Sequence, residues 1–214
     1  SRGSHISRPE PLRQVTISRV PPAAALNPMA ARSLVGLAGL PTILATGPFD
    51  DQADADQLAA AFATVRSRCR AQLVLLGGGE YRATVLRRSF AQGAGSSVHV
   101  IRDLTEDRWP YLIAAADVVV PENATGYTTL LDVLGAGRPV VAQADPTIVR
   151  LVVPASAGLI YRRGDVSGMA GALLRLLTTP ALRHGMGCRA RTVARRYHLQ
   201  RMALQRIDQR NEYA

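Results

Sequence analysis

Short apolar runs alternate with amphipathic stretches along most of the chain. Runs of five to seven residues predict buried strands at 42–47, 71–77, 97–101, 117–121, 138–143 and 157–161. Apolar residues spaced three or four apart predict helices at 53–68, 80–92, 107–116, 127–136, 165–178, 180–195 and 198–211. Buried strands that alternate with helices are typical of an α/β fold in which a doubly wound parallel sheet carries helices on both faces.

The same pattern divides the chain into three segments. Residues 1–40 are rich in proline and alanine, begin with what looks like a tag remnant, and are interpreted as a linker or edge segment with a strand-like piece at 15–20. Residues 41–196 form the expected domain, and residues 197–214 a C-terminal helix. The ligand of a doubly wound sheet is expected at the carboxyl ends of the strands, where the strand order reverses.

Charge adds a possible partner without identifying it. The net charge is +10, and every one of the 26 basic residues is an arginine. The stretch 183–210 is the densest in arginine and contains a single acid, Asp208. Its arginines lie at helical spacing: Arg183, Arg189, Arg191, Arg195, Arg196, Arg201, Arg206 and Arg210. This stretch is interpreted equally well as a solvated helix face or as a surface that contacts an anionic membrane.

Other composition features exclude several classes. Aromatic residues make up only 5% and no nucleic-acid-binding motif appears, so nucleic acid is not the expected partner. No apolar run approaches the ~20 residues of a membrane span. Cys69 and Cys188 are interpreted as free thiols, which favours a reducing, cytoplasmic location. No metal and no cofactor is expected.

A glycine-rich turn follows the second predicted strand, in "LLGGGE" (75–80). A dinucleotide fingerprint would place glycines at 77, 79 and 82, but position 82 is Arg82. The acid that should follow the next strand is also missing, because Arg102 stands there. A Walker-type phosphate loop needs a lysine, and the chain has none. A dinucleotide site is therefore not expected here.

A better candidate for anion binding is the helix at 127–136, which follows the fourth predicted strand. Gly126 permits a tight turn, and Tyr127, Thr128 and Thr129 open the helix. Its first N–H groups lack helical partners and lie at the positive end of the helix dipole, so a diphosphate fits there without any lysine. Asp132 lies one turn after Thr128, where its carboxylate is suited to accept hydrogen bonds from a ribose.

The stretch "AADVVVPENATGYTTLLDVLGAGRPVVA" resembles the most characteristic segment of retaining glycosyltransferases of the GT-B type. "ILATGPFDDQADADQLAAAF", "QLVLLGGGEYRATVL" and "VHVIRDLTEDRWPYLIAAAD" resemble other family segments in the right order, over nearly the whole chain. The resemblance implies one Rossmann-like half of a GT-B fold, the half that binds a nucleotide-diphosphate sugar. It also implies a missing N-terminal acceptor domain, and it carries Gly47 over as a donor-site position.

Several charged positions depart from the family pattern. Pro48 and Ala53 stand where the family has arginine and lysine, and Ala124 replaces the first acid of its E-x7-E pair, whose second acid is Asp132. Loss of one such electrostatic group typically costs ~10²–10³ in rate. Two hypotheses therefore stay open: a working glycosyltransferase with unassigned catalytic residues, or a degenerate relative that acts as an interaction or regulatory module. Candidates to compensate for these losses are Arg102, Arg138 and Arg150.

Overall fold

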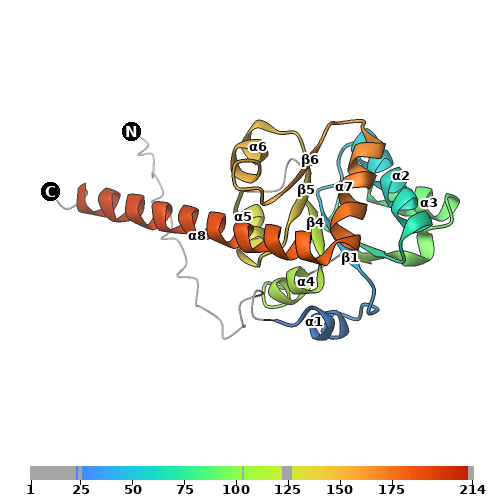
Figure 1. The fold of residues 1–214 in the computed structure, drawn as a ribbon, viewed down its shortest axis with the longest axis horizontal. Coiled ribbons are helices and arrows are strands. Elements are labelled where there is room, and N and C mark those ends of the chain that lie inside the picture. The colour runs from blue at the N-terminus through green and yellow to red at the C-terminus, as the bar shows by residue number, and fades with distance from the viewer. Residues whose placement is uncertain (1–22, 24–25, 103, 122–126, 212–214) are drawn as a thin grey trace, which may run out of the picture.

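Six parallel strands form one sheet in the order β3-β2-β1-β4-β5-β6, as the computed structural model shows (Figure 1). It describes residues 23, 26–102, 104–121 and 127–211, with the backbone alone for 127–129 and 200–211. The strands are β1 (Thr42–Thr46), β2 (Gln72–Leu76), β3 (Val98–Ile101), β4 (Val118–Pro121), β5 (Val140–Gln143) and β6 (Gly158–Tyr161). The order reverses between β1 and β4, which confirms the doubly wound α/β prediction.

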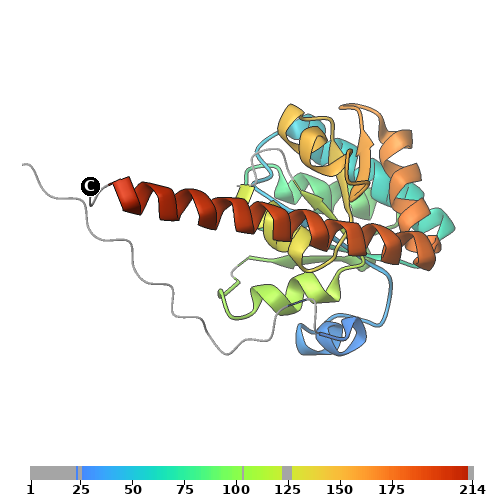
Figure 2. The ribbon, with the colours of Figure 1, turned by 60° about the vertical axis from the view of Figure 1, so that its left-hand side comes forward.

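Helices cover both faces of this sheet. One face carries α2 (Gln52–Arg68), α3 (Arg82–Ala91) and α7 (Val166–Thr178). The other carries α1 (Pro28–Leu34), α4 (Trp109–Ala115), α5 (Tyr127–Gly135), α6 (Pro146–Val152) and the first half of α8 (Pro180–Asn211). The rest of α8 extends beyond the domain, as two views show (Figures 1 and 2).

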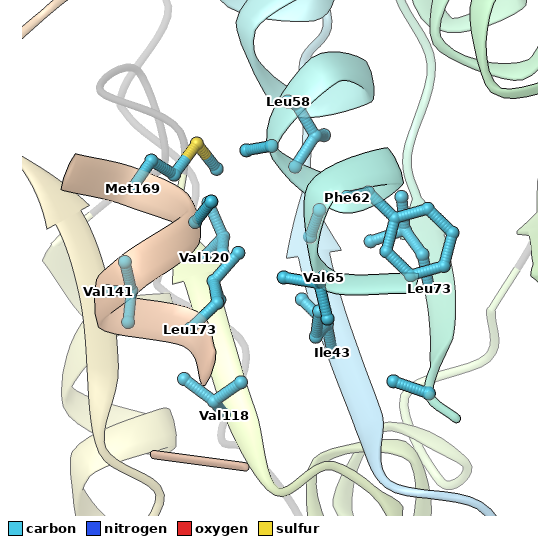
Figure 3. Packing of buried hydrophobic residues seen from close by; sticks show 14 of the residues in the cluster. Ile43, Leu58, Phe62, Val65, Leu73, Val118, Val120, Val141, Met169 and Leu173 are labelled. Atoms are coloured by element: carbon cyan, nitrogen blue, oxygen red, sulfur yellow. The ribbon is translucent and has the colours of Figure 1, made fainter. Parts of the chain in front are cut away.

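Alternate residues of each strand enter two separate cores. Ile43 of β1 and Val118 of β4 contact the α2 and α7 side, where Phe62 and Leu173 are fully buried (Figure 3). Their neighbour Leu44 points to the opposite face and packs beneath α1, α4 and α5. Because the strands are buried on both faces, they appear in the sequence as continuous apolar runs.

Two short helices were not predicted. Helix α1 lies in the segment interpreted as a linker, yet it packs on α4, and its Arg32 side chain is only 7% exposed. Helix α6 lies between β5 and β6. Both begin with the same signal, a side-chain cap followed by proline: Asn27 accepts from Met29 N, and Asp145 accepts from Thr147 N. The structured part of the chain therefore begins before residue 41.

Two further expectations need correction. The C-terminal helices predicted at 180–195 and 198–211 form one continuous helix, α8, since no proline or glycine interrupts the sequence between them. The helix predicted at 107–116 begins two residues later, as α4, with Pro110 in its first turn, where a missing N–H breaks no helical hydrogen bond. The strand-like piece predicted at 15–20 lies outside the described residues.

Glycines allow α8 to pass close to the end of α5. Gly137, which follows the end of that helix, has a φ of +72°. A Cβ built on Gly187 of α8 would lie 2.3 Å from the Gly137 carbonyl oxygen. Helix α8 thus packs backbone to backbone against the loop that joins α5 to β5.

Candidate functional site

The carboxyl ends of β1 and β4 form the candidate site. Thr46 and Pro121 are paired in register at these ends. The chain leaves β1 toward α2 on one face and leaves β4 toward α5 on the other. This divergence at the reversal of strand order opens the crevice in which α/β sheets bind ligands.

A small cavity of about 40 Å³ lies at this edge, with room for a few water molecules only. Its polar lining comes from three strands and the start of α2: Thr46, Asp51, Asp54, Gln143 and Tyr161. Two of these side chains are carboxylates. The lining of the cavity therefore carries negative charge, whereas a diphosphate site is expected to carry positive charge.

One arginine compensates both carboxylates. Arg163, which follows β6, forms an ion pair with Asp51 and donates from Nε to Asp54 Oδ1 at 3.1 Å. Asp51 also caps α2, because its carboxylate accepts from the backbone N of Asp54 at 3.0 Å. The hydrogen bond from Arg163 lowers the pKa of Asp51, and the same contact raises the pKa of Arg163. The three charges bind the β6–α7 connection to the beginning of α2.

The glycine-rich turn packs against the loop after β1. Gly47 N donates to Leu76 O at 2.7 Å, and Phe49 N donates to Gly78 O at 3.0 Å. Gly79 has a φ of +117°, and a Cβ there would lie 2.4 Å from Phe49 N. Arg82, which stands at the position of a third fingerprint glycine, donates to Gly77 O at 2.6 Å. These glycines serve the contact between two loops.

The predicted anion-binding helix starts at Tyr127, after the carboxyl end of β4. Gly126 lies outside the described residues, and Thr128 and Thr129 are described only as backbone in the first turn of α5. Among the apolar residues of α5, Leu130, Val133 and Leu134 are buried and Leu131 is half-buried. Gly47 and the start of α5 follow the paired ends of β1 and β4.

Asp132 lies at a different hollow. Its Oδ2 accepts a hydrogen bond from Trp109 Nε1 of α4 at 3.4 Å. Loss of hydration in this setting raises the pKa of the Asp132 carboxyl, and the Trp109 bond partly opposes the rise. The hollow is about 890 Å³ and lies between α4, α5 and α8, with Tyr197 on its α8 side. Asp132 does not line the small cavity at the strand ends.

The remaining predicted position is peripheral, and sequence reasoning missed others. Arg102 follows the edge strand β3 and is exposed. Sequence analysis overlooked Arg163, which contacts Asp51 from 112 residues away. No local sequence pattern predicts an ion pair between residues so far apart in the chain. Within the described residues, no group of three or more His, Cys, Asp or Glu side chains is placed to hold a metal ion.

Comparison with known proteins gives one family. Residues 40–179 match the family model described as "Glycosyl transferases group 1". No curated protein sequence matches the chain.

Several solved structures share the fold. Sucrose-phosphate synthase from Thermosynechococcus elongatus has a TM-score of 0.71 at 24% identity, covering 88% of this chain and 49% of the synthase. Anabaena HepE in complex with UDP and glucose has a TM-score of 0.71 at 15% identity, covering 85% and 52%. The C-terminal domain of LpcC from Francisella tularensis has a TM-score of 0.70 at 14% identity, covering 81% and 94%. The chain thus spans about half the length of the first two proteins and nearly all of the third.

Proposed function

The chain belongs to the glycosyl transferases group 1 family, and on that premise we propose that it is the donor-binding half of a glycosyltransferase. Its ligand in this proposal is a nucleotide-diphosphate sugar. The observation that carries the proposal is the position of α5, which begins at Tyr127 beyond the carboxyl end of β4, beside the reversal of strand order. A diphosphate placed there accepts hydrogen bonds from the first backbone N–H groups of α5.

The division of labour follows from this placement. Tyr127, Thr128 and Thr129 supply backbone N–H groups to the diphosphate, whose negative charge is favoured at the positive end of the helix dipole. Gly47 gives the close approach on the β1 side, and the role of Gly126, outside the described residues, stays a prediction. Acceptor contacts come from a second, N-terminal domain in this proposal. Its support is that this chain covers 94% of a solved C-terminal domain and about half of two longer relatives.

The Asp132 carboxylate is proposed to accept hydrogen bonds from the hydroxyl groups of the donor's ribose, and Trp109 holds it in place. For Asp132 to reach the nucleotide, the ribose must extend from the start of α5 toward the hollow between α4 and α5. Asp132 is exposed at the edge of this hollow, so its carboxylate can accept hydrogen bonds from hydroxyl groups. Arg102, exposed after β3, is proposed to contact the donor from the other side of the crevice.

Calorimetry on the full chain tests this assignment. Titration with UDP, GDP and ADP is expected to give micromolar binding for one of them. Asp132→Ala should weaken that binding by roughly tenfold, the usual effect of losing a hydrogen bond to a charged group. Asp107→Ala, which removes an exposed carboxylate from the loop before α4, should leave the affinity unchanged. Equal losses in both variants would exclude a specific role for Asp132.

A degenerate, non-catalytic module is the second candidate, and one observation favours it. Asp51 and Asp54 line the cavity at the strand ends, in the turn where the resemblance implies a lysine. Their charge opposes a diphosphate, and the only arginine described in contact with both is Arg163. A correctly folded chain that releases no heat with any nucleoside diphosphate would support this candidate over the first.

We also infer a peripheral contact between α8 and an anionic membrane, on the cytoplasmic side. Among the described residues, no helix is both long enough and apolar enough to cross a bilayer. Support for a surface contact comes from the part of α8 that extends past the domain (Figure 2). In the same helix Arg195, Arg196 and Leu199 are exposed. The unpaired Cys69 and Cys188 favour a reducing compartment.

Vesicle sedimentation tests the membrane contact. Binding to phosphatidylglycerol vesicles should weaken with salt and in an Arg195→Gln/Arg196→Gln variant, because both changes reduce electrostatic attraction. Phosphatidylcholine vesicles are the control and should not bind. Equal sedimentation with both lipids would contradict the inference.

A further inference from the structure

One carboxylate, at the opposite edge of the sheet from the proposed donor site, pairs with two arginines. A third arginine, Arg138, lies near that carboxylate, and Arg191 lies near Arg138. Asp117 directly precedes β4, and its Oδ2 accepts from the backbone N of Thr42, at the start of β1. Around it stand the residues we call the arginine cluster, contributed by α1, the α5–β5 connection and α8: Arg32, Arg138, Arg183 and Arg191.

Two members of the cluster are satisfied by protein groups. Arg32 donates from Nη2 to Asp117 Oδ2 at 2.5 Å and from Nε to Ala115 O at 2.9 Å, so this pair is buried and neutral. Arg183 lies 3.4 Å from Asp117 Oδ1 and donates to Leu176 O at 2.8 Å, near the end of α7. One carboxylate thus serves two guanidinium groups and is fully occupied.

The other two members lack such partners. The Nε of Arg138 is buried and has no hydrogen-bond partner among the described residues. Arg191 donates from Nη2 to Cys188 Sγ at 3.3 Å, and sulfur is a weak acceptor. Its Nη1 approaches the backbone of Gly137 so closely that a Cβ there would lie 2.0 Å away. Arg138 and Arg191 are each half-buried as residues, so neither side chain is fully enclosed.

The charge balance of the cluster is strongly positive. Four arginines and one aspartate leave a net charge of +3. Burial and the repulsion of Arg32, Arg191 and Arg183 lower the pKa of Arg138 to about 10, against the attraction of Asp117. Arg138 still carries its proton at neutral pH. Partly desolvated charges of one sign are unfavourable unless an opposite charge joins them.

We propose that Arg138, Arg183 and Arg191 form a binding site for a small tetrahedral dianion, either inorganic phosphate or the phosphoryl group of a phosphate monoester. The planar guanidinium presents paired donors that match such oxygens. A dianion reduces the local charge from +3 to +1. It also supplies acceptors for the donors of Arg138 and Arg191. Asp117 lies at the amino ends of β1 and β4, whereas Arg191 also lines the hollow that contains Asp132, so the site borders the region proposed for the ribose.

Thermal unfolding of the full chain tests the site. Phosphate replaces sodium chloride at constant ionic strength, so general screening stays fixed. The unfolding temperature should rise and then saturate in the unaltered chain, because a ligand that binds only the folded state stabilises it. Arg138→Gln should abolish the rise. Arg175→Gln removes the same charge from an exposed position of α7 and should retain it.

Two additional measurements keep the test decisive. In chloride alone, Arg138→Gln should unfold at the same temperature as the unaltered chain or higher, since it removes repulsion; this separates loss of a site from misfolding. Glycerol phosphate, compared with inorganic phosphate, shows which source binds more tightly. A rise that persists in Arg138→Gln, or no rise beyond that given by chloride, would overturn the proposal.

Discussion

The close passage of α8 over the α5–β5 connection predicts unequal effects for two alanine substitutions in one helix. A Cβ at Gly187 would lie 2.3 Å from Gly137 O, whereas a Cβ at Gly185 meets only Arg189 Nη1, at 3.5 Å. Both glycines lie inside α8, so alanine gains about 1 kcal/mol of helix propensity at either position. That gain cancels when the two variants are compared.

What remains is the steric cost at position 187. A separation of 2.3 Å to a backbone oxygen forces the helix or the loop to move, and such overpacking typically costs about 1–3 kcal/mol. Gly185→Ala should therefore be more stable than the unaltered chain by about 1 kcal/mol, and Gly187→Ala less stable than Gly185→Ala by about 1–3 kcal/mol. The Gly187→Ala substitution should also displace the guanidinium group of Arg191, which lies beside Gly137.

Urea unfolding at fixed temperature measures both differences, and thermal unfolding should follow at about 2–4 °C per kcal/mol for a chain of this size. Unchanged urea dependence across the three proteins would show that all unfold from the same compact state. Equal stabilisation by the two alanines would refute the backbone contact between α8 and Gly137, and with it the placement of Arg191 in the arginine cluster.

Three further outcomes are expected. Asp117→Ala should destabilise the fold by about 3–5 kcal/mol in urea unfolding, because it leaves the buried guanidinium of Arg32 without its carboxylate partner. A loss below about 1 kcal/mol would contradict this prediction. Burial lowers the pKa of His99, so below pH 6.5 the unfolded chain binds a proton more readily than the folded chain does. The free energy of unfolding should therefore fall from pH 7 to pH 5, and it should fall less in His99→Gln. Equal falls in the two proteins would contradict this prediction. Ala53→Lys, at an exposed position of α2, should tighten binding of a nucleoside diphosphate in calorimetry; unchanged affinity would place the diphosphate elsewhere.

The fold was predictable because its strands are buried on both faces. The continuous run Val118–Val120 has no polar position to mislead a strand prediction, and Gly137 marks the end of α5. The two missed helices, α1 and α6, are seven residues each, too short for apolar periodicity to stand out. Their signal was the capped Asn–Pro and Asp–Pro pairs at 27–28 and 145–146.

The candidate site was only partly predictable. The start of α5 after β4 follows from local sequence, because a strand end and a helix start lie close together along the chain. The pairing of Arg163 with Asp51 and Asp54 depends on how β6 and α2 meet in space, across more than one hundred residues. The same holds for Asp132, whose neighbour Trp109 comes from another helix. Spacing alone contains no information on such contacts.

The central claim is that backbone N–H groups at the start of α5 bind the diphosphate of the donor. The most direct measurement is a titration of the isotopically labelled chain with UDP, GDP and ADP, followed through the amide resonances of Tyr127, Thr128 and Thr129. The account predicts that one nucleotide shifts these three resonances in a saturable way and leaves the amide of Arg138, at the opposite edge, unmoved. Saturable shifts that spare residues 127–129 would contradict it, as would a folded protein whose spectrum none of the three nucleotides changes.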